Sequence, residues 1–168
     1  MVSRESEGAR ILSVDVGSSS VRAELYDDVG DSVEGTEVKL DYEFEYTPDG
    51  GAEKDADELL DLVVRAVDGT LSEAGGAEIS GVAMSTFWHS VLGLDRDGRP
   101  TTPILTWADR RAAECVPDLR ERLDERANHR RTGCVPHSSY WPAKLLWSSR
   151  AMPVAYAKTE RWVSPYAE

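Results

Sequence analysis

One stretch near the amino end, residues 11–26, limits the folds open to this chain more than any other. An apolar run from Ile11 ends at Asp15, a glycine and three serines follow, and apolar alternation then resumes as far as Tyr26. This pattern predicts two strands joined by a tight polar turn. Glycine allows a ligand to approach the backbone closely, and successive amides and hydroxyls suit an anion such as phosphate. The candidate phosphate-binding residues of this turn are Gly17, Ser18, Ser19 and Ser20.

Asp15 stands at the end of the first predicted strand, beside this turn. A carboxylate there could hold a divalent cation through water, because magnesium keeps much of its hydration shell in proteins. A Gly-Ser turn in a β-hairpin also occurs without any ligand. On these residues alone, a phosphate and metal site and a plain hairpin both remain open.

Composition and charge narrow the class of protein. The chain has 168 residues, of which 40% are hydrophobic, so we expect one folding unit with a real core. Its 31 acidic and 19 basic residues give a net charge of -12, which repels nucleic acid and anionic membranes. The first residues are charged and no apolar run reaches the length of a membrane span. These features favour a soluble, cytoplasmic protein, and they leave small phosphorylated ligands open as partners.

The first half of the chain predicts a mixed sheet with one helix. Residues 10–16, 20–26 and 32–46 alternate as three consecutive strands, which implies an antiparallel meander. A helix begins near Asp55, and residues 79–85 form a buried strand parallel to the first because a helical crossover precedes it. We expect the acidic residues of 53–61 to face solvent. The expected buried stripe of the helix is Leu59, Leu60, Val63, Val64, Val67 and Leu71.

The second half predicts shorter elements. A turn with Asp-Gly at residues 96–99 supports a hairpin between residues 91–95 and 100–106. A helical pattern over residues 109–128 contains Pro117, which should interrupt or restart the helix. Further helical pieces are expected at 144–149 and 154–158, and a strand at 161–163.

Four segments in order carry a resemblance to a known family. They are Asp15-Val-Gly-Ser-Ser-Ser-Val-Arg22, Met84-Ser-Thr-Phe-Trp-His-Ser90, Thr106-Trp-Ala-Asp-Arg-Arg111, and Thr132-Gly133 leading to Lys144-Leu-Leu-Trp147. Together they resemble the amino-terminal domain of the FGGY family of carbohydrate kinases, most closely its gluconokinase branch. The resemblance covers nearly the whole chain.

The resemblance implies an α/β fold of the ribonuclease H-like, actin-like ATPase type, with a mixed sheet flanked by helices. Residues 1–9 would be a polar tail. Residues 10–168 would be the sugar-binding domain, incomplete at its carboxyl terminus, and the second, ATP-binding lobe would be absent. An incomplete domain would leave apolar surface uncovered, so a homo-oligomer is possible.

The family also implies roles for particular residues. Asp15 would orient magnesium-bound phosphates of ATP, and Arg22 would join the serine turn in offsetting phosphate charge. The implied sugar-binding residues are Trp88, His89, Trp107, Asp109, Ser139 and Tyr140. Arg111 could pair with a sugar-acid carboxylate or with a neighbouring acid. Trp107 could equally be core, Asp109 could cap a helix, and Lys144 is expected to be structural.

These roles predict an ATP- and Mg²⁺-dependent kinase of a sugar or sugar acid, with gluconate first and xylulose or a related polyol next. Trp88 stands where methionine is frequent in the family, which leaves the sugar open. The general-base aspartate of the family would lie beyond Glu168, so the chain alone is expected to be inactive. The alternatives are a non-catalytic or degenerate sugar-binding module and a ribonuclease H-like metal-dependent nuclease, which the net charge opposes.

Overall fold

The computed structural model describes residues 8–165, which form two compact units. The first unit comprises the described residues up to Glu43 together with Glu58–Thr86. The second comprises Phe44–Asp57 and the described residues from Phe87 onward. Each unit has its own sheets and is described separately.

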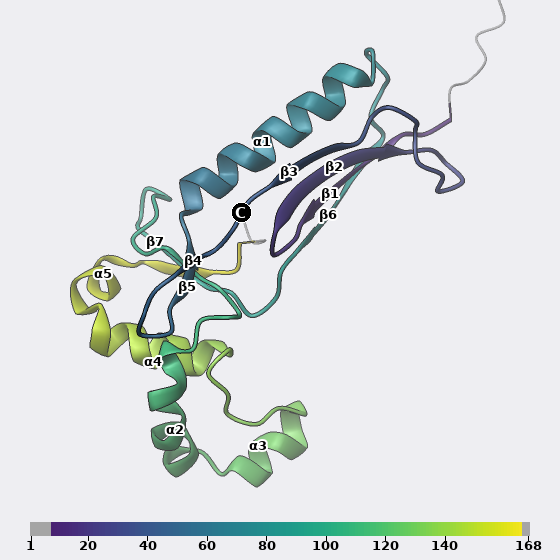
Figure 1. Ribbon diagram of the computed structural model, residues 1–168. Coiled ribbons are helices and arrows are strands. Elements are labelled where there is room, and N and C mark those ends of the chain that lie inside the picture. Colours follow the sequence, from purple (N-terminus) through teal and green to yellow (C-terminus); the bar gives the residue numbers. More distant parts are fainter. Residues whose placement is uncertain (1–7, 166–168) are drawn as a thin grey trace, which may run out of the picture. The chain divides into compact units, whose positions relative to one another are not determined.

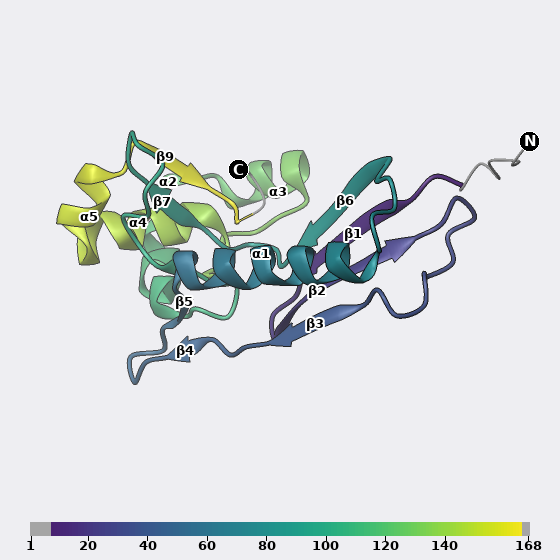
Figure 2. The same ribbon diagram turned by 90° about the horizontal axis from the view of Figure 1, so that it is seen from above.

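The first unit contains a four-stranded sheet in the order β3-β2-β1-β6 (Figures 1 and 2). Its strands are β1 (Ile11–Val16), β2 (Ser20–Tyr26), β3 (Val38–Asp41) and β6 (Gly81–Thr86). The first three are antiparallel neighbours, and β6 runs parallel to β1. The predicted hairpin and parallel crossover are therefore confirmed, but β6 is largely exposed, so the expectation of a buried strand there is wrong. The register places Asp15 between Arg22 on β2 and Ser85 on β6.

Helix α1 (Ala56–Glu73) lies along this sheet (Figure 1). Thr70 is fully buried, and its hydroxyl donates to the Ala23 carbonyl of β2 at 2.9 Å. At the preceding residue, Gly69, an added Cβ would lie 3.0 Å from a methyl group of Val38 on β3. Small and short side chains therefore let the helix backbone approach the strands closely.

The predicted apolar stripe of this helix is partly wrong. Leu59 is buried as expected, but Leu60, Val64 and Leu71 are exposed. The buried face instead continues through Ala66 and Thr70. The prediction assumed that the large apolar residues of the helix are the buried ones. The face in contact with the sheet instead carries small side chains, because the helix and the strands lie close together.

The third predicted strand, residues 32–46, is also not continuous. Gly35 has a left-handed backbone (φ 81°) in a turn closed by the Thr36 amide, which donates to the Val33 carbonyl. Strand β3 ends at Asp41, and β4 (Glu45–Tyr46) belongs to a different sheet in the second unit. The alternating pattern thus spans a turn and two strands.

The second unit holds two small sheets. One has the order β4-β5-β8, with β5 at Ala52–Lys54 and β8 at Ile104–Leu105. The other pairs β7 (Leu92–Leu94) with β9 (Arg161–Val163). The predicted Asp-Gly turn is confirmed, since the Gly98 amide donates to the Asp95 carbonyl. The main partner of β7 is nevertheless β9, while an isolated bridge joins Leu94 to Pro100.

Helices cover these sheets. A 3-10 turn (Arg111–Cys115) leads into α2 (Val116–Arg122), α3 (Glu125–Thr132), α4 (Trp141–Ala151) and α5 (Pro153–Lys158). Pro117 restarts the helix as predicted, because the first turn of α2 needs no amide donor at that position. One core cluster of this unit comprises Val91, Leu105, Ala112, Cys115, Ala143 and Trp147. Within residues 8–165, no helix combines the length and apolar character needed to cross a bilayer.

Replacing Thr70 by Val should destabilise the chain by about 1 kcal/mol, because the shape is kept while a buried hydrogen bond to β2 is lost. Urea unfolding of Thr70→Val beside the wild-type chain measures this change. Ser72→Ala, at an exposed hydroxyl of the same helix, is the matched control. Equal stability of the Thr70 variant and the wild type would show that the contact does not hold the helix on the sheet.

Candidate functional site

The turn between β1 and β2 presents its serines to solvent. The Gly17 amide donates to the Ser20 carbonyl at 2.9 Å, which closes the turn. Ser18, Ser19 and the Asp15 side chain are all exposed. The Ser85 hydroxyl, from the parallel strand β6, donates to an Asp15 carboxylate oxygen. The first unit therefore brings together the predicted phosphate turn and the predicted metal-binding carboxylate.

Tyr42 stabilises the backbone of this turn through two hydrogen bonds, a role that was not predicted. Its amide donates to the Ser19 carbonyl at 2.9 Å, and its hydroxyl donates to the Gly17 carbonyl. Burial, with a smaller contribution from the Asp15 charge, raises the pKa of Tyr42 above its usual value, so the hydroxyl stays a donor. The sequence offered no signal for this role, since Tyr42 follows a strand that was predicted to continue past it.

Arg22 lies on β2, two residues after Ser20 of the turn, with its side chain about half exposed. Its guanidinium is 4.0 Å from a Glu37 carboxylate oxygen that is equally exposed. Such surface pairs contribute little and separate easily. Arg22 is thus not committed to a structural partner.

The oxygen ligands of the first unit suit hydrated magnesium. Within residues 8–165, no three side chains of His, Cys, Asp or Glu gather as a direct metal site. The exposed Asp15 carboxylate at a strand end, with serine hydroxyls next to it, offers the hard oxygen atoms that suit a Mg²⁺ ion with its retained water.

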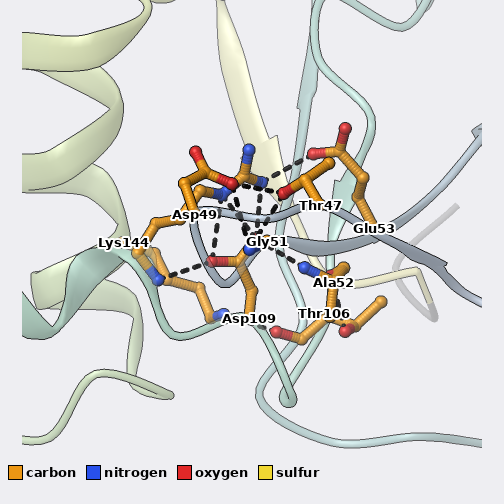
Figure 3. A network of polar contacts seen from close by, with 9 residues as sticks. Thr47, Asp49, Gly51, Ala52, Glu53, Thr106, Asp109 and Lys144 are labelled. Atoms are coloured by element: carbon orange, nitrogen blue, oxygen red, sulfur yellow. Dashed lines mark hydrogen bonds and ion pairs between the residues drawn. The ribbon is translucent and has the colours of Figure 1, made fainter.

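A buried charge network occupies the second unit (Figure 3). Asp109 is 3% exposed, and its carboxylate is 2.5 Å from the Arg111 guanidinium. The same Arg111 nitrogen is 2.6 Å from the Glu53 carboxylate. The prediction that Glu53 belongs to a solvated acidic face is wrong, because β5 turns this residue toward Arg111. Asp109 and Arg111 thus face each other rather than solvent.

Backbone groups complete this network. The Asp109 carboxylate also accepts from the amides of Ala52 and Arg111, at 3.3 and 3.0 Å. A Cβ on Gly51 would lie 2.2 Å from the Thr47 hydroxyl and 2.8 Å from the Arg111 guanidinium carbon, so a larger residue would displace these side chains. The guanidinium also stacks over the Trp147 ring, 4.5 Å from its centroid. Glycine at position 51 and the aromatic ring at position 147 together shape the space that Arg111 fills.

Lys144 of α4 is the largest fully buried side chain in the described part of the chain. It is 1% exposed, and its amino group donates to the Thr106 carbonyl at 2.5 Å. Burial lowers the pKa of Lys144 to about 8, although the Asp109 charge opposes this shift and the Arg111 charge adds to it. The structural role predicted for Lys144 therefore has a definite form: it fixes the segment that precedes Trp107.

Five of the predicted sugar-binding residues lie together on the second unit, in what we call the exposed aromatic face: Trp88, His89 and Trp107, which are exposed, and Ser139 and Tyr140, which are partly exposed. Trp88 is 79% exposed and Trp107 is 45% exposed. The His89 and Tyr140 rings meet at 4.8 Å, and the Ser139 hydroxyl donates to the Trp107 carbonyl at 3.0 Å. Trp107 is thus displayed to solvent rather than packed in the core.

His89 has the left-handed backbone (φ 60°) that few residues other than glycine adopt. It follows Trp88 in the loop after β6, where the chain turns away from the sheet. Strained residues of this kind are often found at binding sites, because the surrounding structure fixes an unusual side-chain direction. The left-handed backbone of His89 therefore supports the prediction that this loop belongs to a binding site.

Comparison with known proteins identifies the family. Residues 10–166 match the model of the amino-terminal domain of the FGGY family of carbohydrate kinases. The chain belongs to this family. The resemblance deduced from the four sequence segments is confirmed.

Individual relatives are similar over nearly the whole chain. The gluconokinase of Bacillus subtilis (strain 168) is 27% identical over 154 residues, which is 91% of this chain and 29% of the relative. The apulose kinase of Pectobacterium atrosepticum is 32% identical over 149 residues, 88% of this chain and 30% of the relative. The chain therefore spans less than a third of the length of these curated relatives.

Solved structures confirm the fold. The gluconate kinase of Lactobacillus acidophilus superposes with a TM-score of 0.82 at 28% identity, over 94% of this chain and 31% of that one. The xylulose kinase of Rhodospirillum rubrum gives a TM-score of 0.87 at 23% identity, over 94% of this chain and 32% of that one. The mixed α/β fold is that of FGGY sugar kinases, as predicted, and has the actin-like ATPase architecture.

Replacing Lys144 by Met should change how stability depends on pH. Between pH 8 and 10.5 the unfolded chain binds more protons at Lys144 than the folded chain, so this residue makes stability rise with pH over that range. Below pH 8 both states are protonated at Lys144, and its contribution to stability stays constant at the lower value. The unfolding free energy of the wild type, minus that of Lys144→Met, should therefore rise by roughly 3 kcal/mol from pH 7 to 10.5.

Urea unfolding of both chains at several pH values measures this difference. Titration of all other groups cancels in the subtraction. Lys158→Met, at an exposed lysine of α5, is the matched control and should show no such rise. A difference for Lys144 that stays constant with pH would mean that this lysine titrates alike in the folded and unfolded chains.

Proposed function

We propose that this chain is the sugar-binding part of an ATP-dependent kinase that phosphorylates a sugar or sugar acid, with gluconate as the first candidate and xylulose or a related polyol as the next. The observation that carries the proposal is the exposed aromatic face of the second unit, supported by a buried charge network. The gluconokinase and gluconate kinase relatives support gluconate, and xylulose kinase relatives support the second candidate.

The exposed aromatic face has the chemistry of a sugar site. Faces of Trp88 and Trp107 can pack against the C–H groups of a polyol, while His89, Ser139 and Tyr140 offer polar atoms for its hydroxyls. Asp109 and Arg111 act in this proposal from below the face, because their hydrogen bonds to each other and to Glu53 hold the segment that carries Trp107.

On the first unit, we assign the phosphate side of the reaction to the β1–β2 turn. Gly17, Ser18, Ser19 and Ser20 would bind phosphate oxygens of ATP through amides and hydroxyls, and Arg22 would offset their charge. Asp15 would hold the hydrated Mg²⁺ that neutralises the phosphates. Tyr42 contributes by keeping the turn in one conformation.

We infer that this chain alone does not transfer phosphate at a useful rate. Phosphoryl transfer depends on groups that position and stabilise both substrates, and the chain spans 29% of its gluconokinase relative. In the proposal, the general base and most of the ATP-binding surface come from the remainder of a full-length kinase. Loss of a general base costs about 10²- to 10⁴-fold in rate.

Calorimetric titration of the 168-residue chain with gluconate and with xylulose tests the proposal. We expect weak binding, with a dissociation constant on the order of a millimolar, because one domain offers only part of the contacts of a whole kinase. Lack of binding of either compound to a folded chain, shown to be folded by its circular dichroism, would contradict the proposal.

Trp107→Ala should weaken gluconate or xylulose binding by about two- to tenfold, because an aromatic ring contact contributes about 0.5–1.5 kcal/mol. The same titration measures this loss. Tyr46→Ala removes an exposed aromatic ring of β4 that is not part of the exposed aromatic face, and it should leave the affinity unchanged. Unaltered binding by the Trp107 variant would remove Trp107 from the proposed site.

A further inference from the structure

His137 lies beside the exposed aromatic face and has no part in the function proposed so far. It is exposed, and its ring centroid is 5.7 Å from that of Tyr140. Tyr140 in turn meets His89 at 4.8 Å. Two imidazole rings therefore flank one phenol ring on the surface that carries the proposed sugar-binding residues.

One hydrogen bond fixes the chemistry of the His137 ring. The Ser139 amide donates to its Nδ1 atom at 3.1 Å. Because Nδ1 accepts, it carries no proton, and we assign the ring proton of the neutral imidazole to Nε2. The structure gives Nε2 no hydrogen-bond partner among residues 8–165. His137 thus presents an N–H donor at an exposed position.

The same hydrogen bond ties His137 to the rest of the exposed aromatic face. Ser139, whose amide binds the His137 ring, also donates its hydroxyl to the Trp107 carbonyl at 3.0 Å. The imidazole is therefore held in one orientation relative to the segment that displays Trp107. A donor fixed in advance loses little conformational entropy when it binds a ligand.

Charge on this surface favours a ligand rich in acceptors. The Asp109 carboxylate, two residues after Trp107, is buried and paired with Arg111, so its charge is offset. The polar groups of this surface are the exposed imidazoles of His89 and His137 and the partly exposed phenol and hydroxyl of Tyr140 and Ser139. A polyol that carries a carboxylate would therefore meet hydrogen-bond donors on the exposed aromatic face.

We propose that His137 is a further sugar-binding residue, whose Nε2–H donates to an oxygen of the bound polyol or sugar acid. This inference rests on the proposed function, since it adds a contact to the same site. The hydrogen bond from Ser139 orients the ring, and the Nε2 donor meets the ligand.

The test separates the two nitrogen atoms of the ring. In His137→Asn, the amide oxygen can still accept from Ser139, but no donor remains at the position of Nε2. In His137→Ala, both are lost. His129→Asn, at an exposed histidine of α3, is the matched control. All three variants change exposed side chains, so we expect them to fold.

Calorimetric titration of the 168-residue chain with gluconate and with xylulose gives the first readout. His137→Asn should bind about three- to tenfold more weakly than the wild type, as expected for one net hydrogen bond, and His137→Ala at least as weakly. His129→Asn should bind normally. A loss for gluconate alone assigns the donor to the carboxylate, and a loss for both compounds assigns it to a shared hydroxyl.

Nitrogen NMR of the histidine rings gives a readout that a purely structural role would not move. In the wild type, the His137 Nε2 resonance should show the protonated nitrogen of a neutral ring and should shift on addition of gluconate, while that of His129 stays in place. Wild-type affinity in His137→Asn, or an Nε2 resonance unchanged at saturation, overturns the inference and leaves the proposed function standing. Absence of binding by the wild type overturns both.

Discussion

The buried Asp109 carboxylate is the constraint on which the second unit depends. An ionised carboxylate removed from water is tolerated only when nearly every lone pair has a donor, and here a guanidinium and two backbone amides supply them. These donors come from Ala52 of β5 and from Arg111 at the start of the 3-10 turn, and Lys144 of α4 binds the Thr106 carbonyl three residues before Asp109. Separate segments are thereby fixed in register around one charge.

Trp107 shows what this constraint achieves. Its neighbours in the chain are held from within: Lys144 binds the Thr106 carbonyl, and Arg111 binds Asp109. A large aromatic ring would gain free energy by burial, yet Trp107 remains 45% exposed because both sides of the segment are committed to polar partners. The β1–β2 turn of the first unit is fixed in a similar way. Tyr42 donates hydrogen bonds to the Gly17 and Ser19 carbonyls, while the side chains of Ser18 and Ser19 remain in solvent.

Local patterns predicted the elements whose causes are local. The β1–β2 hairpin, the parallel β6 strand and the restart at Pro117 follow from alternation, a helical crossover and the missing proline amide. The buried face of α1 was missed because Gly69 and Thr70 are chosen by close contact with β2 and β3, which no helical period reveals. Likewise, the break after Asp41 depends on β4 joining β5, a pairing between segments that only the folded chain brings together.

The residues of the candidate site also fall into those that local sequence patterns predicted and those that they did not. Motifs supplied the displayed residues, such as Trp88 and His89, but not the residues that hold them, because Glu53 and Tyr42 act through contacts distant in sequence. This division has a physical consequence for specificity. Trp88 is 79% exposed and contacts His89 edge to face, so its replacement would cost the fold little while it alters the exposed surface. A change at Asp109 or Arg111 would instead leave a buried charge without its partner. A frame of this kind allows its exposed residues to change while the buried network stays as it is.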